Sequence, residues 1–191
     1  MDAIHGGRTP IRVVLAMGSN LGDRRAHLRE GIRGLSAWME IHAISRVVEC
    51  PPWGPIADQP PFLNLVLLAT TALEPHELLE KTQEVERLRG RERVVDQGPR
   101  TLDVDIIFYD EVKLDHPELT IPHPDWQGRP FVRELLGDLG KDVVDPVSGR
   151  AFAPRSRDAL RAQGLDPVAP LEGLEEIQFR SSEVPSSGAL P

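Results

Sequence analysis

Apolar segments of strand length alternate with amphipathic segments of helix length in an order that few folds accommodate. Apolar runs predict four strands, over residues 11–17, 41–49, 62–73 and 102–109. A helix over 24–37, capped by Asp23, separates the first two strands, and a helix over 75–89 separates the last two. The order β-α-β-β-α-β predicts an α+β fold with a ferredoxin-like core, an α/β sandwich whose antiparallel sheet carries the helices on one face.

Further segments are expected as additions to this core. Residues 112–121 are expected to form an extra β-hairpin, and residues 131–138 and 155–163 to form C-terminal helices. Two proline-rich stretches, 50–61 and 122–130, are expected to be stiff loops, because proline fixes its own φ and restricts the preceding residue.

Composition limits the classes of protein that the chain can belong to. The net charge of −8 argues against binding to nucleic acid or to anionic membranes, and the apolar runs are too short to span a bilayer. The single cysteine excludes an internal disulfide and fits a reducing compartment, so we expect a cytoplasmic protein. We also expect it to be a monomer. One domain is expected over 11–165, with loosely packed or flexible termini over 1–10 and 166–191. Removal of residues 165–191 is expected to leave activity intact.

Two aspartates, Asp103 and Asp105, lie at alternate positions of the last predicted strand and therefore share one face. The other face is expected to turn aliphatic and aromatic side chains to a core: Leu102, Val104, Ile106 and Phe108. Aspartate is depleted in strands, so the pair requires an explanation. One explanation is Mg²⁺, which binds through one or two carboxylates and substrate phosphates; the alternative is a solvated sheet face.

A cluster of arginines precedes the aspartates. Within residues 87–100 stand five arginines and two acids: Arg87, Arg89, Arg91, Arg93 and Arg100, with Glu92 and Asp96. Because the guanidinium fork suits phosphate oxygens, a basic segment beside a carboxylate pair favours phosphoryl-transfer chemistry. For any one of these arginines, surface pairing with a neighbouring glutamate is the alternative.

Four of the nine aromatic residues flank the two stiff loops: Trp53, Phe62, Trp126 and Phe131. Such rings can stack on a flat ligand, and Asn64, on the same strand face as Phe62, can donate to and accept from a heterocycle. Alternatively, Phe62 and Phe131 close the core. In the second loop His123, held between two prolines, stands near Arg129 and is either a surface residue or a phosphate contact.

These segments, taken in order, resemble the 6-hydroxymethyl-7,8-dihydropterin pyrophosphokinase family of the folate pathway. The similarity covers residues 11–147 and rests on these motifs: Gly18-Ser19-Asn20-Leu21-Gly22-Asp23-Arg24, Pro51-Pro52-Trp53-Gly54-Pro55, Asp58-Gln59-Pro60, Phe62-Leu63-Asn64, Glu86 with Gly90-Arg91-x-Arg93, Gly98-Pro99-Arg100-Thr101-Leu102-Asp103-Val104-Asp105-Ile106, Ile121-Pro122-His123-Pro124 and Arg129-Pro130-Phe131. The resemblance implies transfer of pyrophosphate from ATP to the pterin hydroxymethyl group, with release of AMP.

The resemblance also implies roles for individual residues. Asp103 and Asp105 would hold two Mg²⁺ ions, and with Arg91 and Arg100 they would form the catalytic group. The ATP side would be lined by Gln83, Glu86, Arg91, Arg93, Arg100, Ile106, His123 and Arg129. The pterin side would be lined by Cys50, Pro51, Pro52, Trp53, Phe62, Asn64, Asp103 and Phe131. The loops 50–61 and 90–99 would close over the substrates and exclude water.

The chain departs from the family pattern at several positions. Gln97 replaces an aromatic residue, Cys50 replaces a threonine, and the stretch from Arg133 to Gly137 differs. None of these removes an expected metal or phosphate contact. Two other readings compete: a nucleotidyltransferase, disfavoured by the 84 residues between Ser19 and Asp103, and a catalytically silent ferredoxin-like binding module.

Overall fold

A computed structural model describes residues 9–91, 98–175 and 177 of the chain. The six strands of its main sheet are β1 (Ile11–Ser19), β2 (Glu40–Ile44), β3 (Val48–Cys50), β4 (Phe62–Thr71), β5 (Asp103–Tyr109) and β8 (Asp166–Pro167). The helices are α1 (Arg24–Leu35), α2 (Pro75–Leu88), α3 (Pro130–Leu135), the 3₁₀ helix η1 (Leu136–Leu139) and α4 (Arg157–Arg161). None of the described helices is both long and apolar enough to span a bilayer.

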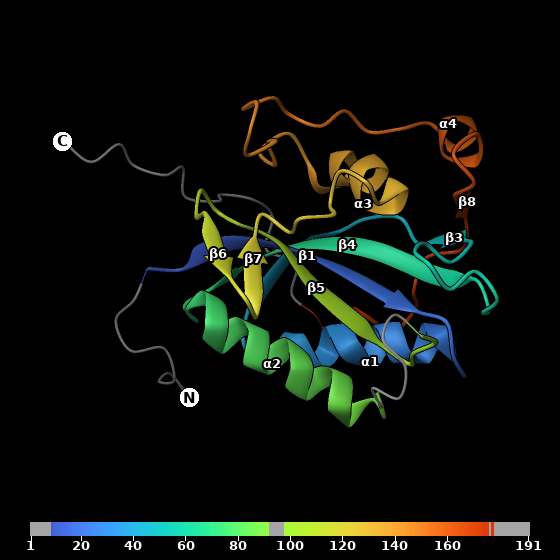
Figure 1. The fold of residues 1–191 in the computed structure, drawn as a ribbon, viewed down its shortest axis with the longest axis horizontal. Helices are drawn as coiled ribbons and strands as arrows, with labels where there is room; N and C mark the ends of the chain where they lie inside the picture. The colour runs from blue at the N-terminus through green and yellow to red at the C-terminus, as the bar shows by residue number, and fades with distance from the viewer. Residues whose placement is uncertain (1–8, 92–97, 176, 178–191) are drawn as a thin grey trace.

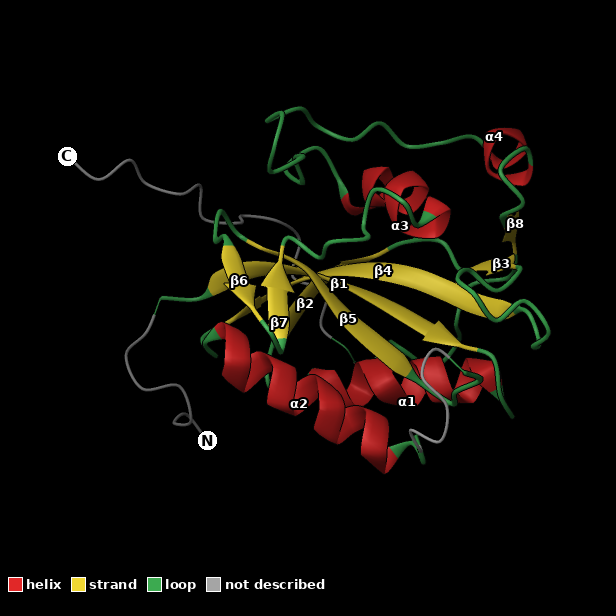
Figure 2. Ribbon diagram, in the orientation of Figure 1, coloured by secondary structure: helices red, strands yellow, loops and turns green. Residues whose placement is uncertain are grey.

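The main sheet confirms the ferredoxin-like fold. Its strands follow the order β5-β1-β4-β3-β8, with β2 also paired to β4, and β5 lies at one edge. The pairings of β1 with β4 and with β5 are antiparallel. Helices α1 and α2 cover one face, while α3 and α4 lie on the opposite side (Figure 1 and Figure 2). The expected hairpin forms from β6 (Leu114–His116) and β7 (Leu119–Ile121).

The second expected strand is two strands, β2 and β3, which pair with the same neighbour, β4. At the break the main-chain N–H of Ser45 donates to the Val66 carbonyl at 2.9 Å, and the Ser45 hydroxyl accepts the Val66 N–H at 3.0 Å. The next residue, Arg46, forms a two-pronged ion pair with Asp138 of η1. The strand divides because these side chains take over the hydrogen bonds that a continuous ladder would make.

Strand β5 also departs from simple alternation. Val14 pairs with Phe108 and Leu15 with Ile106, so a bulge in β5 leaves Ile107 without a partner of its own. Phe108 therefore turns to the face opposite Ile106, where its ring meets that of Trp126 at 5.1 Å and an interplanar angle of 81°. The expectation that Phe108 shares the face of Ile106 is wrong, because the bulge shifts the alternation by one residue.

Two buried clusters, one on each face, hold the sheet in place. The cluster under α1 and α2 contains Leu15, Met17, Leu28, Ile32, Leu65, Leu78, Leu102, Val104 and Ile106, among others. The cluster under α3 contains Val14, Ala16, Val66, Ile107, Phe108, Val132 and Leu135, among others. The sheet is thus a middle layer with apolar side chains on both faces, and polar side chains in its strands stand out against that background.

The first part of the C-terminal segment is packed, which differs from the expected loose terminus. Strand β8 pairs with β3, and Leu174 and Ile177 join the buried cluster beneath α1 and α2. Helix α1 also holds this segment through its arginines: Arg33 donates to the Gly173 carbonyl at 2.6 Å. Residues 1–8, 176 and 178–191 lie outside the described residues.

We expect a chain that ends at Pro167 to be less stable than one that ends at Ile177. The shorter chain loses two buried apolar side chains, Leu174 and Ile177, each worth roughly 1.5–3 kcal/mol of burial. For a chain of this size the melting temperature should fall by at least about 5 °C, measured by circular dichroism. Equal melting temperatures for the two chains would contradict the packing of this segment.

Candidate functional site

Three adjacent strands bring the site together at one end of the sheet. Gly18 of β1 pairs with Asn64 of β4 on one side and with Asp103 of β5 on the other. A Cβ at position 18 would lie 2.6 Å from Oδ1 of Asn64, so any other residue there would displace the Asn64 amide from its place. The register thereby places an amide and a carboxylate on either side of a residue without a side chain.

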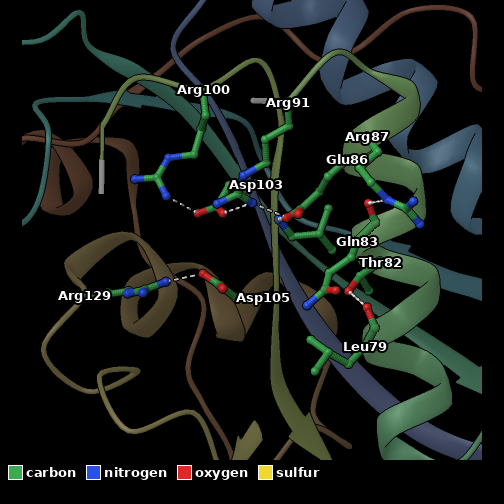
Figure 3. A network of polar contacts seen from close by, with 11 residues as sticks. Leu79, Thr82, Gln83, Glu86, Arg87, Arg91, Arg100, Asp103, Asp105 and Arg129 are labelled. Atoms are coloured by element: carbon green, nitrogen blue, oxygen red, sulfur yellow. Dashed lines mark hydrogen bonds and ion pairs between the residues drawn. The ribbon is translucent and has the colours of Figure 1, made fainter. Parts of the chain in front are cut away.

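Asp103 and Asp105 share a face of β5, as expected, and arginines hold both carboxylates. Arg91 Nη1 lies 2.6 Å from Asp103 Oδ1, and Arg100 Nη1 lies 3.3 Å from Asp103 Oδ2. Arg129, just ahead of α3, pairs with Asp105. Figure 3 shows the two carboxylates stacked along β5 with their arginines around them.

Glu86 of α2 lies between these ion pairs and the buried core. Its side chain accepts the main-chain N–H of Val104 at 2.8 Å and pairs with Arg91, and only 4% of the side chain is exposed. Glu86 is expected from the sequence to line the ATP side. In the structure its contacts are to the protein: it connects α2 to β5 and orients the Arg91 guanidinium toward Asp103 (Figure 3).

The pKa values of two side chains of the site, Asp103 and His123, are displaced from their ordinary ranges. Burial, reinforced by the neighbouring charge of Asp105, raises the pKa of Asp103, while the surrounding arginines oppose this effect. Burial and, to a lesser extent, Arg129 lower the pKa of His123, which favours neutral imidazole. Its Nδ1 accepts the Asp125 main-chain N–H at 3.1 Å, so the proton of the neutral ring is on Nε2.

A pocket of about 140 Å³ opens beside the carboxylates. It is lined by Cys50, Pro51, Trp53, Phe62, Asn64, Arg100, Asp103, Asp125, Arg129 and Phe131. Seven of the residues expected on the pterin side are among them, and Pro52 is not. Two guanidiniums extend over aromatic rings here, Arg100 over Phe62 and Arg129 over Trp53, each 5.5 Å from the ring centre.

Cys50 is a buried thiol at the pocket wall. The Asn64 amide donates to its sulfur at 3.0 Å, and burial raises the pKa of the thiol to about 11. The thiol is therefore protonated at neutral pH and acts as a small polar wall group, with no role as a nucleophile.

Asn20 is a residue that the sequence reasoning did not assign to the site. Its side-chain amide donates to Gln59 Oε1 at 3.0 Å and to the Pro60 carbonyl at 3.1 Å, and its Oδ1 accepts the Arg100 N–H at 2.7 Å. Asn20 thus ties the first proline-rich loop and the Arg100 loop to the end of β1. The signal was present in the Gly18–Arg24 motif, which entered the sequence analysis only as part of the family resemblance and as the source of the Asp23 cap.

The remaining expected residues lie at different depths. The Gln83 side chain extends from α2 toward β5 in Figure 3. The Ile106 side chain is buried in the cluster under α1 and α2, facing away from the pocket. The loop that carries His123 is fixed to β5 by a hydrogen bond from the His123 N–H to the Ile107 carbonyl at 3.0 Å. The expectation for Arg93 falls outside the described residues.

A larger cavity, of about 390 Å³, lies toward the other end of β1. Its wall includes Arg12, Phe108 and Asp142, and no expected site residue within the described ranges lines it. Size alone therefore does not identify the functional pocket. The smaller pocket is distinguished by the carboxylates, guanidiniums and aromatic rings that meet there.

The carboxylates of the site can bind a hard cation such as Mg²⁺ when a bound phosphate and water supply the other oxygen ligands. Among the described residues no group of three or more His, Cys, Asp and Glu side chains could hold a metal ion. Two adjacent carboxylates, Asp103 and Asp105, do fit Mg²⁺, which typically takes one or two carboxylates and completes its shell with water and phosphate oxygens.

Comparison with known proteins agrees with this arrangement. Residues 14–141 match the model of the family described as 7,8-dihydro-6-hydroxymethylpterin-pyrophosphokinase (HPPK). The chain is 38% identical over 135 residues to the 2-amino-4-hydroxy-6-hydroxymethyldihydropteridine pyrophosphokinase of Aquifex aeolicus, covering 71% of this chain and 84% of that protein. It is 34% identical over 178 residues to the Folic acid synthesis protein fol1 of Pneumocystis carinii, covering 91% of this chain but spanning only 24% of that longer protein.

Solved structures support the fold independently. The Plasmodium falciparum HPPK-DHPS wild type with pterin and p-hydroxybenzoate superposes with a TM-score of 0.60 at 14% identity, over 77% of this chain and 42% of that chain. At such low identity the likeness concerns the fold alone. The family match spans the strands that carry Asp103, Asp105 and Asn64, the turn at Gly18 and the loop with Arg129. The chain belongs to the 7,8-dihydro-6-hydroxymethylpterin-pyrophosphokinase family.

Proposed function

We propose that the protein transfers pyrophosphate from ATP to the hydroxymethyl group of 6-hydroxymethyl-7,8-dihydropterin, a step of folate synthesis. The observation that carries the proposal is the meeting of an aromatic pocket with two carboxylates and three arginines at one end of the sheet, in a chain of this family. A flat heterocycle fits the first part and a polyphosphate the second.

In the proposed complex the pterin lies in the pocket between its aromatic walls. Phe131 stacks on the ring, with Phe62 and Trp53 closing the slot. Asn64, 4% exposed, presents its amide to the edge of the heterocycle. The substrate hydroxyl is then held on the side of the pocket that Asp103 lines.

The arginines bind the triphosphate and balance the charge that develops on it. Arg91, Arg100 and Arg129 have side chains that are only 13%, 16% and 17% exposed, so their interactions are weakly screened by water. His123, neutral and with its proton on Nε2, can donate a hydrogen bond to a phosphate oxygen without adding charge. The bond from the pterin oxygen to the β-phosphorus forms, and the bond from that phosphorus to the oxygen of AMP breaks.

We propose that activity depends on magnesium, with Asp103 and Asp105 as the residues that hold two ions. When bound, the ions neutralise phosphate charge and align the two reacting oxygens. We further propose that the enzyme acts as a cytoplasmic monomer, on small molecules alone.

The proposal is tested by incubating the protein with ATP, Mg²⁺ and the reduced hydroxymethylpterin and separating the nucleotides. AMP and the pterin pyrophosphate are expected in equal amounts. Release of inorganic pyrophosphate with AMP joined to an acceptor would indicate a nucleotidyltransferase instead. Absence of any turnover would indicate a binding module.

Replacing either carboxylate of β5 should abolish turnover while the fold survives. We expect Asp103→Ala and Asp105→Ala to reduce AMP formation by about 10³-fold or more, because each removes a charge from the centre that holds the reacting phosphate. Asp142→Asn, at the wall of the larger cavity, is the matched control and should retain activity. Normal turnover in both alanine variants would refute the assignment.

Phe131→Ala should weaken pterin binding more than ATP binding. Stacking of a flat heterocycle on an aromatic ring is worth about 1–3 kcal/mol, so the KM for the pterin should rise at least about fivefold. Phe152→Leu alters a ring that packs on Phe108 outside the pocket and should leave both KM values unchanged. An equal rise in the KM for ATP and for the pterin would argue against stacking by Phe131.

Cys50 should react slowly with thiol reagents in the folded protein. Since its pKa is about 11, only about one thiol in a thousand is ionised at about pH 8, against roughly a quarter for an ordinary cysteine. Labelling with Ellman's reagent should be at least about 100-fold slower in native than in denatured protein, slower still with bound pterin, and faster as the pH rises toward 11. Cys50 is the single cysteine, so the signal has one source. Fast labelling of native protein would contradict its burial.

A further inference from the structure

Within the part of the chain that the structure describes, both carboxylates expected to bind cations are already paired with arginines expected to bind phosphates. Asp103 holds Arg91 and Arg100, and Asp105 holds Arg129. In the proposed function the carboxylates face a cation and the guanidiniums face phosphates. The same side chains cannot make both sets of contacts fully.

These pairs are too buried to be incidental surface contacts. The carboxylates of Asp103 and Asp105 belong to side chains only 20% and 27% exposed, and the arginine side chains are less exposed still. Breaking a pair and leaving one charge unpartnered in such a place is costly, whereas exchanging partners is not. A cation that binds alone must therefore take the carboxylates from the arginines and leave the arginines unpaired. A polyphosphate that binds alone must likewise leave the carboxylates unpaired.

The paired state also leaves polar groups unsatisfied. Nε of Arg100 and Nε of Arg129 are buried and lack a hydrogen-bond partner. Buried donors of this kind are uncommon in stable structures. Each guanidinium pairs with one carboxylate through its Nη1 atom. Arg100 lies over the ring of Phe62 and Arg129 over the ring of Trp53 at the pocket. They can change partner by rotation of side chains, with no rearrangement of the sheet.

We propose that the ion pairs Asp103–Arg91, Asp103–Arg100 and Asp105–Arg129 form a latch that makes binding of a divalent cation and binding of a polyphosphate mutually dependent. The polyphosphate draws the arginines away from the carboxylates, and the carboxylates then accept the cation. Each ligand removes the obstacle to the other, which is positive coupling between two sites, typically worth 5–150-fold in affinity. The inference rests on the proposed function for the identity of the ligands.

The latch predicts that removing one member of an ion pair strengthens ligand binding by the other member. Arg129→Gln releases Asp105 and should raise the affinity of the nucleotide-free protein for Mn²⁺ at least about fivefold, measured by electron paramagnetic resonance of free Mn²⁺. Arg87→Gln is the matched control. It removes a charge from α2 whose guanidinium contacts the Gln83 carbonyl and neither aspartate, so it should change Mn²⁺ affinity less than twofold (Figure 3).

The reciprocal arm uses inorganic triphosphate in the presence of a chelator. Asp105→Asn releases Arg129 and should raise the affinity for triphosphate at least about fivefold, measured by calorimetry. Asp125→Asn removes the same charge from the same pocket, but within the described residues the hydrogen bonds of Asp125 run through its main chain. The variant therefore releases no arginine of these ranges from an ion pair, and its effect should stay below twofold. Equal gains for Asp105→Asn and Asp125→Asn would mean that charge alone acts, and would overturn the latch.

Unchanged or weakened Mn²⁺ binding by Arg129→Gln would also overturn it. Thermal unfolding checks that each variant is folded; if Arg129→Gln is not, Arg129→Lys, which keeps the charge but loses the planar fork, should shift Mn²⁺ affinity in the same direction. Neither arm contains a pterin or measures turnover. Gains of affinity in both arms, in a protein that makes no AMP, would support the latch and refute the reaction. AMP formation without these gains would do the reverse.

Discussion

The antiparallel pairing of β5 with β1 is the constraint on which the site depends. Along the first part of β5 alternate side chains point to opposite faces, so Val104 and Ile106 enter the core under α1 and α2, as does Leu102 just before the strand. Asp103 and Asp105 point to the other face, where Asp103 lines the pocket. Since β5 is an edge strand, its outer side is open to the loops that carry Arg91, Arg100 and Arg129. A slip of one residue in this register would bury both carboxylates and expose the apolar set.

The site and the core are joined at one buried carboxylate. Glu86 accepts the N–H of Val104, a residue whose side chain is in the core and whose two neighbours are the aspartates of the site. The same carboxylate pairs with Arg91. Through this single carboxylate, helix α2 therefore sets the position of the strand and of Arg91, one of the arginines proposed to bind phosphate. The packing of α2 against the sheet therefore affects the positions of Asp103, Asp105 and Arg91, although the buried residues of the helix touch no substrate.

Much of this arrangement could be predicted from the sequence because it follows from local pattern. Periodicity located the long strands and both sheet-covering helices, and alternation placed Asp103 with Asp105. The failures concern contacts between distant residues. A side-chain hydrogen bond of Ser45 lies where a strand divides, the bulge at Ile107 turns Phe108 to the other face, and Leu174 packs into the buried cluster beneath α1 and α2. No local pattern encodes these, since each depends on which surface another part of the chain presents.

The charge balance of the site explains how an acidic chain can hold a phosphate site. The net charge of −8 describes the surface as a whole, and the five arginines within residues 87–100 suggest a basic patch. In the structure the arginines at the pocket and beside it are matched by acidic side chains. Arg91, Arg100 and Arg129 pair with the buried Glu86 and with the partly buried Asp103 and Asp105. The site is close to neutral, because His123 is uncharged as well. A neutral, poorly hydrated site favours ligands that bring charge of both signs together, since a lone anion or cation would leave one set of protein charges buried without partners.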